Sequence, residues 1–187
     1  MSAALVIRDA DALLDAEAIR AIYRPHIEGS SVSFELETPR AEVIAERIRE
    51  TQRYWVWLVA EQNGEIVGYA YGGQHRTRAA YDESVETSVY IHQGAVGRGV
   101  GRQLYTALFA RLAELGYCQA YAGATLPNPA SVAFHESMGF VVVGVFPKIG
   151  YKFGRFHDVI WLHRELREEP LPEGSLMARS RAQAARS

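Results

Sequence analysis

The chain has 187 residues, of which 48% are hydrophobic and 22% are charged, and 20 basic against 22 acidic residues give a net charge of −2. These values fit one soluble globular domain that buries its own core. This small net charge does not favour binding to nucleic acid or to a membrane surface. We therefore expect a small-molecule substrate.

The single cysteine, Cys118, cannot form an internal disulfide, and a small buried residue is a better interpretation of it than an acyl-accepting nucleophile. The acidic N-terminal stretch lacks the apolar core of a signal peptide. No apolar run approaches the roughly 20 residues of a membrane helix. We therefore expect a cytoplasmic protein with no membrane span.

The first third of the chain predicts two helices. Residues 4–8 form an expected strand and residues 13–27 an expected helix, which Pro25 should bend or end. Thr38 and Pro39 predict the N-cap and first position of a second helix. Its apolar face would consist of Ala41, Ile44, Ala45 and Ile48.

Strands dominate the rest of the chain. Residues 54–61 and 65–73 are rich in β-branched and aromatic side chains, and Asn63-Gly64 between them is a strong hairpin signal. Further strands are expected over 85–91, 120–125, 140–146 and 157–166, and further helices over 99–115 and 129–138. This order predicts an α/β fold, a mixed sheet with helices on both faces, in a single domain over residues 1–166. The polar, alanine-rich residues 167–187 predict a disordered tail.

The segment from Val89 to Arg102 runs from a strand into a helix through three alternating glycines, Gly97, Gly99 and Gly101. Such glycines can turn backbone N–H groups toward one point, where the helix adds its positive dipole end, so the segment predicts a phosphate site. The G-x-G-x-G spacing does not match the G-x-G-x-x-G of dinucleotide sites, and no lysine follows as in a P-loop. A glycine-rich turn without a ligand is the alternative.

This loop resembles the acyl-coenzyme A pyrophosphate loop of the GNAT superfamily of N-acetyltransferases, Gln/Arg-x-x-Gly-x-Gly/Ala. Here Val96 stands where Gln or Arg is usual. The resemblance implies acetyl-CoA as a co-substrate and no metal. It implies acetyl-CoA contacts from Val89, Tyr90, Ile91, Val96, Gly97, Arg98, Gly99, Val100, Gly101, Arg102 and Asn128.

Acetyl transfer to an amine needs a base, because an aliphatic or α-ammonium group must lose a proton before it attacks. Glu86, on the strand that leads into the loop, is the candidate base; a solvated or ion-paired carboxylate is the alternative. If the strand opens away from its neighbour, the backbone N–H groups of Tyr90 and Ile91 could stabilise the thioester oxygen.

His135 lies in a segment, Asn128 to Phe140, that resembles a GNAT motif in which many members carry Tyr at this position. The phosphinothricin and methionine sulfoximine N-acetyltransferase type carries His there. Four more segments resemble that type, 31–35, 78–90, 104–106 and 150–159, with Glu83 in place of a usual Trp.

The resemblance spans residues 5–166 and implies the GNAT acyltransferase fold, a mixed, mostly antiparallel twisted sheet. It also implies a homodimer and acetyl transfer to the amino group of a small amino-acid analogue. Glu86 and His135 would be catalytic, with His135 either contacting the substrate or shuttling protons. Expected substrate contacts are Phe34, Tyr71, Arg78, Tyr81, Glu86, Thr87 and Ser88. Two alternatives stay open, a protein or peptide N-acetyltransferase and a non-catalytic acyl-CoA binding module.

Overall fold

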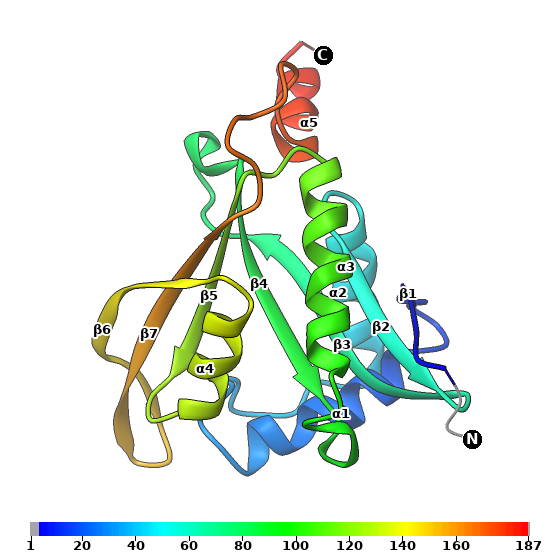
Figure 1. Ribbon diagram of the computed structural model, residues 1–187, viewed down its shortest axis with the longest axis vertical. Coiled ribbons are helices and arrows are strands. Elements are labelled where there is room, and N and C mark those ends of the chain that lie inside the picture. The colour runs from blue at the N-terminus through cyan, green and yellow to red at the C-terminus, as the bar shows by residue number, and fades with distance from the viewer. Residues whose placement is uncertain (1–3, 187) are drawn as a thin grey trace.

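The computed structural model describes residues 4–186 and is built around one seven-stranded sheet (Figure 1). The strand order is β1-β2-β3-β4-β5-β7-β6, and all neighbours are antiparallel except the parallel pair β4 and β5. The expected mixed, mostly antiparallel sheet is therefore confirmed. The strands are β1 Val6–Asp9, β2 Trp57–Gln62, β3 Glu65–Gln74, β4 Ser84–Ile91, β5 Gln119–Thr125, β6 Val141–Lys152 and β7 Arg155–Glu165.

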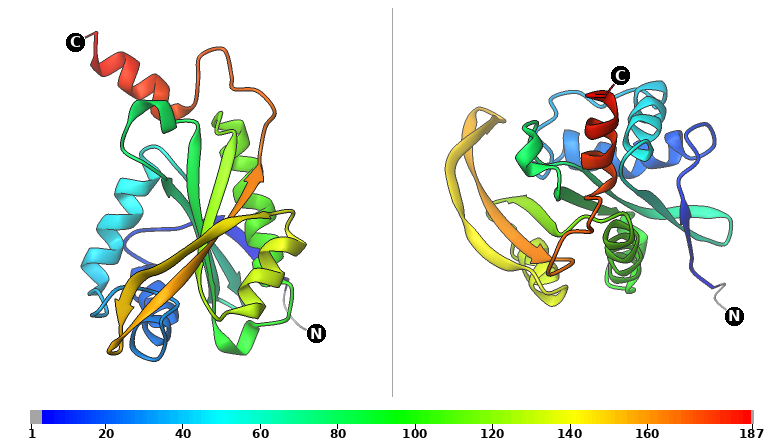
Figure 2. Two further views of the ribbon diagram at one scale, coloured as in Figure 1. Left: turned by 90° about the vertical axis from the view of Figure 1, so that its left-hand side faces the viewer. Right: turned by 90° about the horizontal axis from the view of Figure 1, so that it is seen from above.

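Helices cover both faces of the sheet, as expected (Figure 2). Successive residues of a strand face opposite sides, so Leu58 of β2 packs in the core under α3, while Trp57 and Val59 pack with α1 and α2. The helices are α1 Ala16–Glu28, α2 Ala41–Gln52, α3 Val100–Glu114, α4 Pro129–Ser137 and α5 Leu176–Ala184, with short 3₁₀ turns η1 Ala79–Tyr81 and η2 Gln93–Ala95. No helix among residues 4–186 has the length and apolarity to cross a membrane.

Of two helix predictions near the N-terminus, the one for Pro25 is narrowed and the one for Thr38 is wrong. Pro25 does not end α1, which continues to Glu28. Thr38 is not the N-cap of α2, because the amides of Val43 and Ile44 bond the carbonyl of Arg40, and the helix begins at Ala41. The Thr38 hydroxyl instead donates to the carboxylate of Glu28, at 2.8 Å.

The two closing strands are longer than predicted. β6 continues past Phe146 to Lys152, and β7 begins at Arg155, so the residues expected to connect them form a hairpin. Phe153 and Gly154 turn this hairpin with positive φ angles of 53° and 73°. The hairpin bends away from the rest of the sheet (Figure 2) and provides one wall of a cavity described below.

The segment after residue 166 differs most from expectation, because helix α5 forms where a disordered tail is predicted. Both carboxylate oxygens of Glu83 accept from the backbone N–H of Ser175, at 3.1 Å each, and the Ser175 hydroxyl donates to the carbonyl of Asp82. Arg181 of α5 pairs with the carboxylate of Asp82, at 2.6 Å. These contacts join residues distant in sequence, which composition alone does not reveal. They also explain why a glutamate at position 83 is compatible with the fold.

Candidate active site

The site begins where β4 and β5 separate. The two strands pair only from Ser84 to Glu86, and the rest of β4 has no neighbour on that side. The N–H of Gly72 points to β2, so Thr87 opposite it directs its backbone groups away from β3. The same alternation directs the N–H groups of Val89 and Ile91 into the gap. The N–H of Tyr90 faces β3 instead, so the prediction that it is free is wrong.

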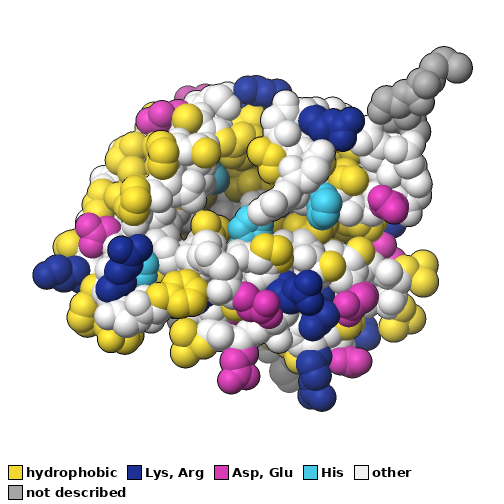
Figure 3. All heavy atoms as spheres, turned by 90° about the horizontal axis from the view of Figure 1, so that it is seen from below, with side chains coloured by type: hydrophobic (Ala, Val, Ile, Leu, Met, Phe, Trp, Pro, Cys, Tyr) yellow, Lys and Arg dark blue, Asp and Glu magenta, His cyan; other side chains and the backbone are white. Residues whose placement is uncertain are grey.

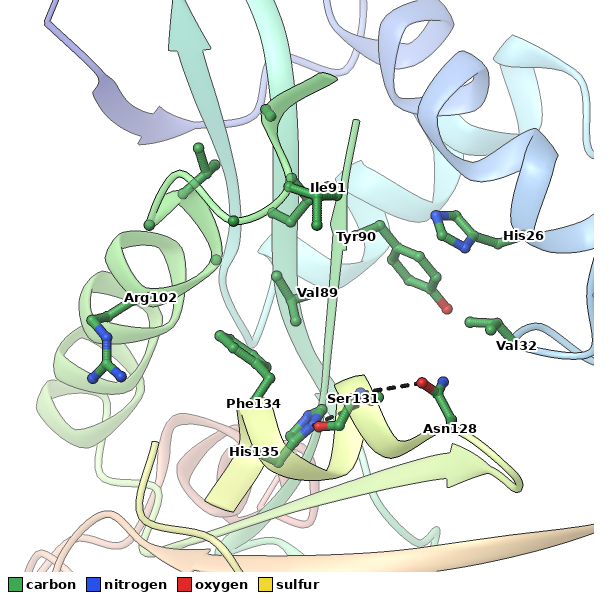
Figure 4. A pocket seen from close by; sticks show the side chains of 16 residues that line it. His26, Val32, Val89, Tyr90, Ile91, Arg102, Asn128, Ser131, Phe134 and His135 are labelled. Atoms are coloured by element: carbon green, nitrogen blue, oxygen red, sulfur yellow. Dashed lines mark hydrogen bonds between the residues drawn. The ribbon is translucent and has the colours of Figure 1, made fainter. Parts of the chain in front are cut away.

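A cavity of about 510 Å³ lies on the α3 and α4 side of this gap (Figure 4). The glycine loop forms one end of it. Gly97 and Gly99 have φ angles of 76° and 80°, which residues other than glycine rarely adopt. A Cβ atom on either glycine would meet open space, so an incoming group can approach the backbone. The predicted contacts that line the cavity are Val89, Tyr90, Ile91, Val96, Gly97, Gly99, Val100, Gly101, Arg102 and Asn128.

Arg98 is the predicted contact that does not line this cavity. Its guanidinium donates to the carbonyl of Gly94, at 3.3 Å, and stabilises the loop itself. Arg102 remains on the cavity wall and donates to the hydroxyl of Ser137 on α4, at 3.2 Å. The loop thus presents backbone N–H groups and one guanidinium, the combination expected of a pyrophosphate site.

His135 is held on the same side by both ring nitrogens. Its Nδ1 lies 2.7 Å from the carbonyl of Ser131 and therefore carries the proton, and its Nε2 accepts from the hydroxyl of Tyr105, at 3.1 Å. Burial lowers the pKa of His135, and the Ser131 carbonyl partly opposes this shift. The imidazole is therefore neutral in neutral solution. Asn128 caps the same helix by accepting from the N–H of Ser131 (Figure 4).

A second cavity, of about 620 Å³, lies on the opposite face of the sheet, between β4, the 32–35 segment and the β6–β7 hairpin. Four predicted substrate residues line it, Phe34, Tyr71, Glu86 and Ser88. Figure 3 shows the end of the molecule in which a hollow opens beside histidine and hydrophobic side chains. The ring of Phe34 packs directly on Gly150, where a Cβ atom would lie 2.1 Å from the ring.

Three predicted substrate residues lie elsewhere. Thr87 faces the α3 side, is 3% exposed, and donates to the carbonyl of Tyr121. Arg78 and Tyr81 lie at and in η1, and neither lines the second cavity. All three lie near Glu86 in sequence. Neighbouring side chains on a strand face opposite sides of the sheet, so Thr87 faces away from the Glu86 side. Arg78 and Tyr81 belong to a part of the β3–β4 connection that does not line the cavity.

The two cavities meet at the gap between β4 and β5. A small space of about 60 Å³ in the gap is lined by Ser88 and Tyr90 of β4, Gly123 and Thr125 of β5, and His135. The first four also line the second cavity, and Tyr90 and His135 also line the first. A group held in one cavity can therefore meet a group held in the other through the sheet.

The charges of the second cavity are few and distinct. Glu86 exposes 41% of its side chain, and burial of the rest raises the pKa of its carboxyl, which Arg76 partly offsets. Glu35 is neutralised by a bidentate ion pair with Arg47, at 2.6 and 3.2 Å. Lys152 is buried and donates to the carbonyls of Ile27 and Ser33. Arg76 and Glu86 are therefore the charges available to a ligand.

A family model described as an acetyltransferase (GNAT) domain matches residues 10–161. The chain belongs to the GNAT acetyltransferase family. Two relatives are a phosphinothricin N-acetyltransferase of Alcaligenes faecalis, 38% identical over 90% of this chain and 85% of that protein, and an L-methionine sulfoximine/L-methionine sulfone acetyltransferase of Pseudomonas aeruginosa, 34% identical over 86% and 94%. The crystal structure of a phosphinothricin acetyltransferase from Sinorhizobium meliloti in complex with AcCoA superposes with a TM-score of 0.85 at 31% identity, covering 91% of this chain and 95% of that one.

Sequence reasoning missed several residues of this GNAT site. Ser131 and Tyr105, which hold His135, were not predicted, although Ser131 lies one helical turn before it and could have been found by spacing. His26 of α1 and Val32 line the first cavity, and nothing in their local sequence indicates this. His75, which lies beside Glu86, was also missed.

Proposed function

We propose that this GNAT enzyme transfers the acetyl group of acetyl-CoA directly to the amino group of a small amino-acid analogue of the phosphinothricin or methionine sulfoximine type. The observation that carries the proposal is the pair of cavities that meet at the β4–β5 gap, one with a glycine loop and one with Glu86. The names of the two relatives described above state that they acetylate such analogues.

The loop from Val96 to Arg102 would hold the pyrophosphate through backbone N–H groups and the Arg102 guanidinium. The N–H groups of Val89 and Ile91 face the gap, so they can bond the acyl-bearing arm there, and Asn128 lines the same cavity. Acetyl-CoA supplies an activated thioester, and the polar groups of the gap are suited to stabilise charge on its carbonyl oxygen.

Glu86 would accept the proton of the substrate ammonium. Its carboxyl has a raised pKa, which brings it closer to the pKa of an amine and makes proton transfer easier than to an ordinary glutamate. Arg76, in the same cavity, suits the carboxylate or phosphinate of an amino-acid analogue, because a guanidinium binds such groups bidentately. Phe34 and Tyr71 would form apolar walls.

His135 would take part in proton transfer near the thioester rather than contact the amine. It lines the gap and the first cavity, which would hold acetyl-CoA (the acetyl-CoA cavity). It does not line the second cavity, which would hold the amine (the amine cavity). Nδ1–H of His135 bonds the Ser131 carbonyl, and Nε2 accepts from the Tyr105 hydroxyl. In the proposed step Nδ1 gives its proton to the leaving thiolate while Nε2 takes the Tyr105 hydroxyl proton, and a proton from solvent restores Tyr105.

The proposed enzyme is a cytoplasmic homodimer. Support for a dimer comes from β6, an edge strand of the sheet with large exposed apolar side chains. Val143, Ile149 and Phe156 of the β6–β7 hairpin are 60%, 59% and 61% exposed. Sedimentation of the wild type at micromolar concentration tests this, and a monomer would contradict it. Support for the cytoplasm is the free thiol of Cys118.

The test of the reaction is acetyl transfer from labelled acetyl-CoA to phosphinothricin, methionine sulfoximine and a peptide with a free N-terminus, each at matched concentration. The proposal predicts turnover on at least one of the two analogues and little on the peptide. Turnover on the peptide alone would contradict the substrate assignment and favour a peptide acetyltransferase. Acetyl-CoA binding without transfer to any amine would favour a non-catalytic module.

A further inference from the structure

His75 lies directly after β3 on the face of the amine cavity, and two aromatic residues fix its ring. The imidazole stacks on Tyr121 of β5, with centroids 4.6 Å apart and planes 12° from parallel. Trp161 of β7, which lines the cavity, meets it edge-on at 5.8 Å. The side chain is only 11% exposed. Packing against Tyr121 and Trp161 therefore holds the ring in one position.

The Nδ1 atom of His75 is buried and has no hydrogen-bond partner among residues 4–186. The atom it faces is Oε2 of Glu86, 3.7 Å away. A buried polar atom without a hydrogen-bond partner destabilises the folded state. A small movement of the Glu86 carboxyl would shorten this distance to that of a hydrogen bond. Glu86 is therefore the group that the unpaired nitrogen can bond.

The charged and titratable groups around His75 come from each neighbouring element. Arg76 follows it in the chain and lies over the Trp161 ring, Glu86 belongs to β4, and Tyr121 belongs to β5. His163 of β7 lies beyond Tyr121, with ring centroids 5.0 Å apart, and bonds Gln119. Burial and the charge of Arg76 lower the pKa of His75. A neutral imidazole has one nitrogen free to accept a proton.

We infer that His75 is a positioning and proton-relay residue for Glu86, an inference that rests on the proposed function. The substrate ammonium loses a proton to the Glu86 carboxylate, the resulting O–H passes that proton to Nδ1 of His75, and the imidazolium releases its Nε2 proton to solvent. Proton exchange with solvent then restores the starting tautomer before the next turnover. The relay needs His75 in the tautomer with its proton on Nε2. No other reactant is needed, and Glu86 is returned to its anionic form while the free amine attacks the thioester.

The first experiment needs no turnover, so it can fail separately from the proposed function. The pKa of His75 is measured by histidine NMR in the wild-type enzyme and in Glu86→Gln, with the resonance assigned by its loss in His75→Phe. The inference predicts a pKa lower by at least about 0.5 unit in Glu86→Gln, because the imidazolium loses its carboxylate partner. Equal values would overturn it.

The second experiment compares kcat/KM across pH for wild type, His75→Phe and His75→Asn. Phe keeps the stacking on Tyr121, and Asn keeps a hydrogen-bonding atom near Nδ1 but cannot take a proton. Both variants are expected to lose about tenfold or more on the plateau, and their acid limb should move to lower pH because the pair loses proton affinity. A loss of rate with an unmoved acid limb, or full recovery by Asn, would overturn the relay. Each variant's acetyl-CoA affinity serves as the folding control.

Discussion

The contact between Phe34 and Gly150 allows a sharp test of the amine cavity. Replacing Gly150 with Ala would place a Cβ atom 2.1 Å from Cζ of Phe34 and 2.4 Å from its Cε1. Real Cβ atoms essentially never approach another heavy atom closer than 3.0 Å, so the ring must move by nearly 1 Å. Overpacking of this kind costs about 1–3 kcal/mol, and the lower value applies here because Phe34 is 37% exposed and can yield.

The movement of Phe34 should weaken binding of the amine. A loss of about 1.4 kcal/mol in the binding free energy of the amine corresponds to a tenfold higher KM for it. This KM is measured by release of the CoA thiol. The dissociation constant of acetyl-CoA should stay within about twofold, because its cavity lies on the other face of the sheet and does not include Phe34.

Gly144→Ala is the matched control. Gly144 lies on the same strand, and a Cβ atom there would meet open space. It should leave both constants unchanged. Equal amine KM values in the two variants would contradict a role for Phe34 in amine binding. So would a Gly150→Ala variant whose affinity for acetyl-CoA falls as much as its affinity for the amine.

Three further changes have expected outcomes. Gly99→Ala forces a side chain into a φ of 80°, so calorimetry should show acetyl-CoA binding weakened about fivefold or more with the amine KM unchanged, and unchanged acetyl-CoA binding would contradict the loop assignment. Tyr105→Phe leaves Nε2 of His135 unpaired, so denaturant unfolding should show a loss of about 1–3 kcal/mol together with a lower kcat; no loss of stability would show that the hydrogen bond is absent. Glu83→Ala removes the acceptor of the Ser175 N–H, so limited proteolysis should cut the segment after residue 166 faster than in wild type, and equal rates would contradict docking of α5 through Glu83.

Local signals predicted the fold well where they act over a few residues. The Asn63-Gly64 turn, the glycines of the loop and the helix predicted over 99–115 each depend on neighbours in the chain, and each is found where expected. Helix α5 was missed because the groups that hold it, Glu83 and Asp82, lie about 90 residues earlier, and composition gives no information about such contacts.

The same limit applies to the candidate site. Glu86 was predicted from its place on the strand before the loop, and His135 from a motif, and the structure shows that they line different cavities on opposite faces. Thr87 was grouped with Glu86 because it is next in sequence, yet neighbours on a strand face opposite sides. His75 and Tyr105 reach the site only through sheet pairing and helix packing, and no local pattern marks them.

In the proposed reaction Glu86 accepts the amine proton on one face of the sheet while the glycine loop holds acetyl-CoA on the other. The most direct measurement is kcat/KM between about pH 5.5 and 9.5, with the acetyl-CoA dissociation constant, for wild type and Glu86→Gln. A base must be deprotonated, so wild-type kcat/KM should rise with pH through the raised pKa of the Glu86 carboxyl. Glu86→Gln should lack that limb and lose about 100-fold or more in kcat/KM, with acetyl-CoA binding unchanged. A variant that keeps the wild-type rate and pH profile would contradict the account.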